Sequence, residues 1–145
     1  MAHLTGRSLR EVCRILGAHP GARWLLLVAV VCTAGTWITV LAIPRIPGND
    51  TVVTHYSTTF GIDALGAWRQ LFRLPSIATI LLGMNVGIAV ASIRATRPDA
   101  HPVPLLPPAA QTMLIASALL SAVALVGALF LLRVNLHYFG SSGAI

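Results

Sequence analysis

Three long runs without a charged residue restrict what this sequence can fold into. They are Trp24–Ile43, Leu74–Ile93 and a third run within Ala100–Leu132, whose apolar part begins near Ala109. Roughly twenty helical residues rise about 30 Å, which matches the hydrocarbon thickness of a bilayer. Backbone amides in lipid have no water to bond, so each run must be helical. We therefore predict an all-α membrane protein with three transmembrane helices.

The composition agrees with lipid as the main solvent of this chain. Only 10% of its 145 residues are charged, too few for the surface of a soluble domain of this size. The net charge of +6 comes from arginines that flank the apolar runs, which is typical of membrane topology signals. We therefore predict the lipid bilayer as a partner and no nucleic acid. The two cysteines indicate no disulfide framework, because none lies in the loop after the first run.

The arginines predict an orientation for the chain. Four of the ten precede the first run and two lie between the second and third runs, which places six on one side. Three lie between the first and second runs and one follows the third, which places four on the other side. Cytoplasmic segments carry the excess of arginine, and the largest group is at the N-terminus. We predict a multi-pass protein with a cytoplasmic N-terminus.

These signals predict a single membrane domain over residues 1–145. Its segments are a basic inner segment (1–23), span one (24–43), an outer loop with a short helix (44–73), span two (74–93), a proline-rich inner loop (94–108), span three (109–132) and an outer tail (133–145). In the inner segment, apolar residues from Leu9 to Leu16 share one helical face, with arginines off that face. We expect a short interfacial helix there, and docking on a partner is the alternative.

The outer loop is the longest segment that is neither a span nor a plain linker. Residues 52–57 favour extended chain, and residues 60–62 indicate a bend. Asp63 fits the N-cap of a short helix that runs to Arg73 and lies on the membrane with Trp68 facing down. We expect this loop to form a cap over the spans. Its structural residues are predicted to be His55, Tyr56, Gly61, Asp63 and Trp68.

Small residues recur at helical spacing in two of the predicted spans. Span two carries a G-x-x-x-G ridge, made of Gly83, Gly87 and Ala91. Span three carries a second ridge, made of Ser117, Ser121, Ala124 and Ala128. Small residues let helices approach closely in lipid, so we expect both ridges to pack against other helices. Asn85 lies near the middle of span two and should face protein, because an unpaired amide in lipid is costly.

The sequence gives little support for catalysis or cofactor binding. His55, Asp63 and His137 all fall outside in the predicted topology, and two histidines with a carboxylate can bind zinc or iron. Their spacing matches no ligand motif, so hydrogen-bonded interfacial histidines are the favoured interpretation. No G-x-S-x-G motif is present, and the spans hold no ionisable residue for ion transport and no histidine for haem. We predict no enzyme activity, no cofactor and no metal.

Residues 53–85 resemble an uncharacterised family of small bacterial three-span membrane proteins. The shared pattern is an HY pair, FG-[IV]-D, a glycine, a tryptophan, and a span that opens with proline and holds a central asparagine. In this sequence the pattern is Thr54-His55-Tyr56, Phe60-Gly61-Ile62-Asp63, Gly66, Trp68, Pro75 and Asn85. The resemblance implies the three-span architecture and a bacterial plasma membrane, and it implies no activity.

A looser likeness concerns the start of the outer loop. Pro44, Pro47, His55 and Gly61 are similar to a loop of immunity-type membrane proteins of the SdpI family.

Most aromatic residues fall in the outer half of the predicted membrane topology. They are Trp37, Tyr56, Phe60, Trp68, Phe72, Phe130, Tyr138 and Phe139. An interfacial aromatic belt explains this bias, and a cup that binds a lipid, a quinone-like molecule or a partner is the alternative.

The function that these observations favour is assembly. We predict a non-catalytic accessory subunit that docks through its small-residue helix faces on a larger membrane complex or on another copy of itself. The alternative is an immunity-type or ligand-binding protein that uses the aromatic outer loop for a lipid or another hydrophobic molecule.

Overall fold

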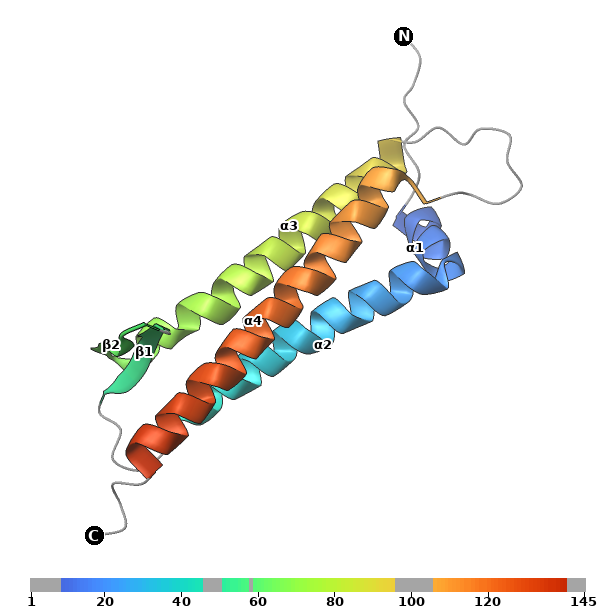
Figure 1. Ribbon diagram of the computed structural model, residues 1–145. Coiled ribbons are helices and arrows are strands. Elements are labelled where there is room, and N and C mark those ends of the chain that lie inside the picture. Colours follow the sequence, from blue (N-terminus) through green and yellow to red (C-terminus); the bar gives the residue numbers. More distant parts are fainter. Residues whose placement is uncertain (1–8, 46–50, 58, 96–105, 141–145) are drawn as a thin grey trace.

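Three long helices lie side by side in the computed structural model, with a β-hairpin at one end and a short helix at the other (Figure 1). The structure describes residues 9–45, 51–57, 59–95 and 106–140. The long helices are α2 (Pro20–Ala42), α3 (Arg73–Ala95) and α4 (Pro108–Gly140). Each is long and apolar enough to cross a membrane, which confirms the three predicted spans at the level of helix length and composition.

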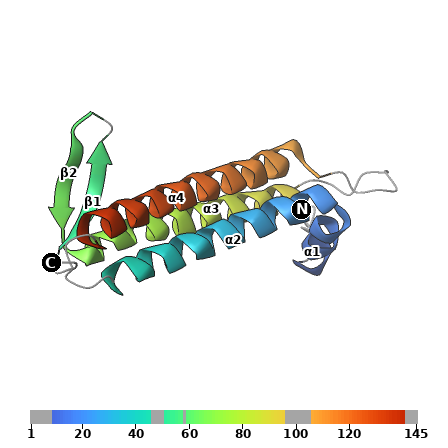
Figure 2. The same cartoon turned by 60° about the horizontal axis from the view of Figure 1, so that its bottom comes forward.

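The remaining elements are short and lie at the two ends of the long helices. They are α1 (Leu9–Ala18), the 3₁₀ turn η1 (Ile43–Arg45), the antiparallel strands β1 (Val52–Ser57) and β2 (Gly61–Gly66), and the 3₁₀ turn η2 (Trp68–Phe72). Figure 2 shows that the hairpin stands across the ends of the helices rather than continuing along them.

Proline residues begin two of the three long helices. Pro20 is the first residue of α2, where the missing N–H of proline would have no helical partner in any case. His19 before it has an extended backbone, which separates α1 from α2. Pro108 begins α4, and the first helical bond runs from the Gln111 N–H to the carbonyl of Pro107 at 3.0 Å.

Two apolar clusters hold the ends of the bundle together. At the α1 end, Ile15 is buried with Ile93 of α3 and Leu114 of α4. At the hairpin end, Val52 of β1 belongs to a buried cluster with Ala128 of α4. Between these ends α4 is the central helix, because it packs along both α2 and α3 while those two helices contact each other less. The hairpin is therefore attached to the bundle through a shared core.

The prediction of a short helix beginning at Asp63 is wrong. Asp63 lies in strand β2, which pairs with β1, and only the following η2 turn is helical. The expected all-α fold therefore describes the spans but omits a small antiparallel sheet. The physical reason is cross-strand pairing: β1 is rich in β-branched and aromatic residues and needs a partner strand for its backbone groups.

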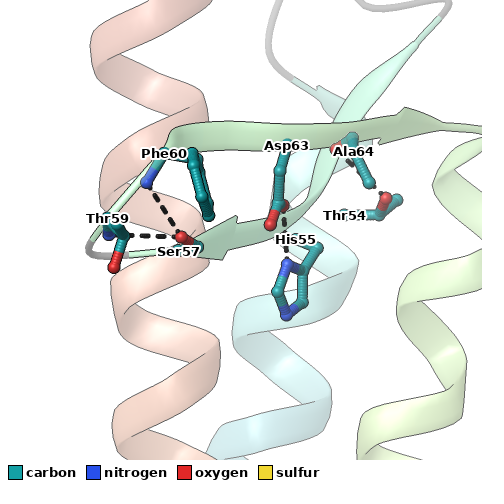
Figure 3. Close-up of polar contacts among 7 residues, drawn as sticks. All are labelled: Thr54, His55, Ser57, Thr59, Phe60, Asp63 and Ala64. Carbon is teal, nitrogen blue, oxygen red and sulfur yellow. Dashed lines mark hydrogen bonds and ion pairs between the residues drawn. The ribbon is translucent and has the colours of Figure 1, made fainter.

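The turn between the strands has a local cause in the sequence. The Ser57 hydroxyl accepts hydrogen bonds from the N–H groups of Thr59 at 3.2 Å and Phe60 at 3.0 Å (Figure 3). Gly61 then has a φ of 75°, a conformation that glycine adopts without the cost other residues meet. The turn thus ends at Phe60, the first residue of the bend predicted at 60–62, and Gly61 and Ile62 begin strand β2.

Helix α4 is longer than the apolar run that predicts it. It continues through Arg133 to Gly140, so residues 133–140 of the predicted outer tail are helical. The end of that tail, 141–145, and most of the predicted proline-rich loop, 96–105, lie outside the described residues.

Candidate functional site

The side chain of Asn135 attaches the hairpin to α4. Its Oδ1 accepts the N–H of Val53 at 2.9 Å, and its Nδ2 donates to the carbonyl of the same residue at 3.1 Å. A further bond from Nδ2 to the Leu131 carbonyl, 2.8 Å, fixes the amide against its own helix. Asn135 and Val53 are both fully buried. The amide therefore pairs with the outer edge of β1 in the way a third strand would.

Sequence analysis missed the role of Asn135. The available signal was its position: a single amide, between Val134 and Leu136, just beyond the end of an apolar run. A buried amide requires hydrogen-bond partners, but the sequence does not say which backbone supplies them.

Aromatic contacts join the hairpin and η2 to the long helices. Tyr56 of β1 meets Phe130 of α4 edge to face, with ring centroids 5.2 Å apart. Trp68 is partly buried on η2 and meets Phe72 at 5.2 Å, and Phe72 lies 6.0 Å from Trp37 of α2. Such pairs are worth roughly 0.5–1.5 kcal/mol beyond the area they bury. The outer aromatic residues therefore form specific contacts across elements.

The candidate metal ligands come together only in part. Nδ1 of His55 lies 2.6 Å from Oδ1 of Asp63 across the hairpin (Figure 3). The His55 side chain is 68% exposed, so solvent screens this pair and it adds little stability. His137 lies on α4 in a groove with Tyr56. Within the described parts of the chain, no group of three histidine, cysteine or acidic side chains is placed to hold a metal ion.

A groove lies between the hairpin and the C-terminal end of α4. Its volume is about 620 Å³, within the range of small-molecule sites. Its walls include Tyr56 and Ile62 from the two strands, and Phe130, Arg133, His137 and Tyr138 from α4.

The small-residue ridge of α4 is used inside the protein. Ser117, Ser121, Ala124 and Ala128 are all buried. The hydroxyl of Thr33 in α2 donates to the Ser121 hydroxyl at 3.1 Å, which identifies α2 as the helix facing this ridge. A second close contact comes from a small residue of α2, because a Cβ on Gly35 would lie 3.1 Å from the Leu125 side chain. Small residues thus permit close packing of α2 on α4.

The small-residue ridge of α3 faces away from the other helices. Gly83, Gly87 and Ala91 are exposed, and a Cβ added to either glycine would meet no atom within 4 Å among the described residues. Ile80, Met84 and Ile88 are exposed beside them. This face of α3 therefore has no packing partner in the part of the chain that the structure describes.

Asn85 lies on the opposite side of α3 from this ridge. It is partly buried and shares a helical face with the buried residues Ala78 and Ala89, seven positions before and four after it. Its side chain makes no hydrogen bond to any described residue. On α3 the hydroxyl of Thr79 accepts a bond from the Trp37 indole N–H of α2 at 3.0 Å.

The geometry defines a class of protein: a small helical protein with three candidate membrane spans and a hairpin clasped to one end. Comparison with known proteins adds no relative, since no family model, no curated protein and no solved structure matches this chain.

Proposed function

We propose that this chain is a non-catalytic assembly subunit of the bacterial plasma membrane that docks on a larger membrane complex through the exposed face of α3. The docking face consists of Gly83, Gly87 and Ala91 with the apolar side chains beside them. The family resemblance in residues 53–85 supports the bacterial membrane, and the excess of arginine before span one supports a cytoplasmic N-terminus.

The observation that carries the proposal is the contrast between glycines. Glycine inside a helix is less favourable than alanine by roughly 1 kcal/mol. At Gly35 that cost is offset by close packing, because a Cβ there would lie 3.1 Å from the Leu125 side chain, closer than ordinary van der Waals contact. At Gly83 and Gly87 a Cβ would meet no atom of the described residues within 4 Å. A G-x-x-x-G ridge with no described helix of its own chain against it is suited to a transmembrane helix of another chain.

The other ridge does not serve docking. In α4 the small residues pack on α2, as described above, so the proposal rests on α3 alone. The exposed apolar neighbours on this face are compatible with either lipid or a partner helix, and the glycines favour a helix.

The test is the size of the complex in mild detergent at native expression. The double variant Gly83→Leu, Gly87→Leu should remain inserted, because both added side chains point away from the bundle, but should migrate as the released chain. The matched control is Gly127→Leu on α4, another glycine where an added Cβ meets nothing. This control should stay in the complex.

The outcomes separate the alternatives. A wild-type chain that migrates alone, with the double variant unchanged, would sink the proposal. A complex that contains only this chain and is lost in the double variant would keep the docking face and replace the larger complex with a self-oligomer.

A further inference from the structure

The groove between the hairpin and α4 has chemistry that the docking proposal does not use. Phe130, Arg133, Val134 and His137 line it from one face of α4, at positions i, i+3, i+4 and i+7. Tyr56 and Ile62, which are paired across the two strands, line it from the hairpin. The groove thus runs along α4, with one wall from this helix and the other from the hairpin.

The groove changes character along its length. Phe130 is the last aromatic residue within the apolar run of α4, and Arg133 is the first charge after that run. His137 follows one turn later, so the lining rises about 10 Å from an aromatic residue at acyl-chain level to polar residues at headgroup level. An amphiphile that lies parallel to α4 matches this gradient.

Arg133 gives the groove a cationic centre. Its side chain is exposed, and it forms no ion pair with Asp63, the one carboxylate whose side chain the structure describes. Asp63 is engaged by His55 instead. A guanidinium at the level of the headgroups is a bidentate donor for a phosphate diester.

We propose that this groove binds one anionic phospholipid, with the phosphate on Arg133 and an acyl chain packed against the Phe130–Tyr56 ring pair. The edge-to-face contact of those two rings, 5.2 Å between centroids, holds the hairpin wall in place beside the chain. The two hydrogen bonds between the Asn135 amide and the Val53 backbone hold the same strand three residues earlier. The site therefore depends on the hairpin being docked, and it is independent of the exposed face of α3.

The experiment measures retained lipid on the full chain. Protein reconstituted with equal amounts of phosphatidylglycerol and phosphatidylcholine is released into mild detergent, and lipid adducts are counted by native mass spectrometry. Wild-type protein should retain phosphatidylglycerol in preference. Arg133→Gln should lower that retention about tenfold, the effect of losing one charge-assisted contact. Arg133→Lys should restore part of it, because the charge remains without the bidentate geometry.

The matched control is Arg69→Gln. Arg69 is an exposed arginine at the same end of the molecule, and it lies over the Trp68 ring at 5.7 Å instead of in the groove. This variant should retain phosphatidylglycerol as the wild type does. Gly83→Leu, Gly87→Leu should also retain it, so failure of the docking proposal and failure of the lipid site give different results.

A second measurement does not depend on removing the arginine. A photoreactive benzoylphenylalanine at position 130 should crosslink to phosphatidylglycerol, and the same residue at exposed position 123 should label the two lipids equally. The proposal would be overturned if the wild type retained both lipids equally or if Arg133→Gln retained as much phosphatidylglycerol as the wild type. It would also be overturned if position 130 crosslinked the two lipids equally, as position 123 is expected to do. Displacement of the lipid by millimolar inorganic phosphate would also overturn it, since it would indicate a site for a soluble anion.

Discussion

Replacing Asn135 with alanine should release the hairpin from the bundle without unfolding the long helices. In the native protein the amide satisfies both backbone groups of Val53, and Val53 has no exposure to solvent. Alanine removes both partners at once. The third bond, to the Leu131 carbonyl, matters less, because that carbonyl lies inside α4 and keeps its helical partner.

The magnitude follows from the two backbone groups left unpaired. A buried donor or acceptor without a partner costs about 1–3 kcal/mol. Two such groups suggest about 3 kcal/mol once some water enters the opened site, which is on the order of a hundredfold in the opening equilibrium of the hairpin. Asn135→Asp should also open the hairpin, because it loses both bonds that Nδ2 donates and would place a buried carboxylate against the Val53 and Leu131 carbonyl oxygens.

The assay is amide hydrogen exchange followed by mass spectrometry on peptides from β1 and from α3. In Asn135→Ala the β1 peptide should exchange on the order of a hundredfold faster, while α3 keeps its protection. Gln111→Ala is the control, because it removes an exposed amide from the same helix. Unchanged exchange in β1 would refute the reasoning. An equal rise in the exchange rates of β1 and α3 would also refute it, because loss of the Asn135 bonds would then destabilise the whole fold and not the hairpin alone.

Four further substitutions test the packing, the exposed polar pair and the topology. Gly35→Ala should lower thermal stability by several degrees, because its Cβ would press on Leu125 at 3.1 Å, whereas Gly83→Ala should leave stability equal or slightly higher in a thermal melt. Asp63→Asn should cost less than about 1 kcal/mol in a denaturant titration, because solvent screens its contact with an exposed histidine. Thr59→Cys, in a background without the native cysteines, should react with an impermeant thiol reagent in intact cells; labelling only after lysis would reverse the predicted orientation.

Much of the architecture was predictable because it is imposed by the solvent. Uncharged runs of span length have few alternatives to helices in lipid, and the structure forms helices at all three. The bend at Gly61 and the extended chain before it were also predictable, since both depend on neighbouring residues. Local signals failed at Asp63, where a good N-cap residue lies in a strand, because pairing with β1 outweighs capping preference.

The candidate sites were predictable only as residue types. The sequence identifies two small-residue ridges by spacing, but spacing is the same whether a ridge is buried or exposed. Only the tertiary structure separates Ser121, which is hydrogen-bonded to α2, from Gly83, which faces away from the other helices. In the same way, His55 and His137 are equivalent in the sequence, and the fold places the first beside Asp63 and the second in the groove.

By itself the sequence determined that the chain makes three apolar helices and which residues are too polar for lipid, because hydropathy acts over short stretches of chain. Only the tertiary structure decided that α4 is the central helix and that Asn135 closes the edge of β1, 82 residues away along the chain. It also decided that Arg133 lines a groove with Tyr56 and Ile62 of the hairpin. These contacts join residues distant in sequence, and their energies depend on how the helices pack rather than on any local pattern.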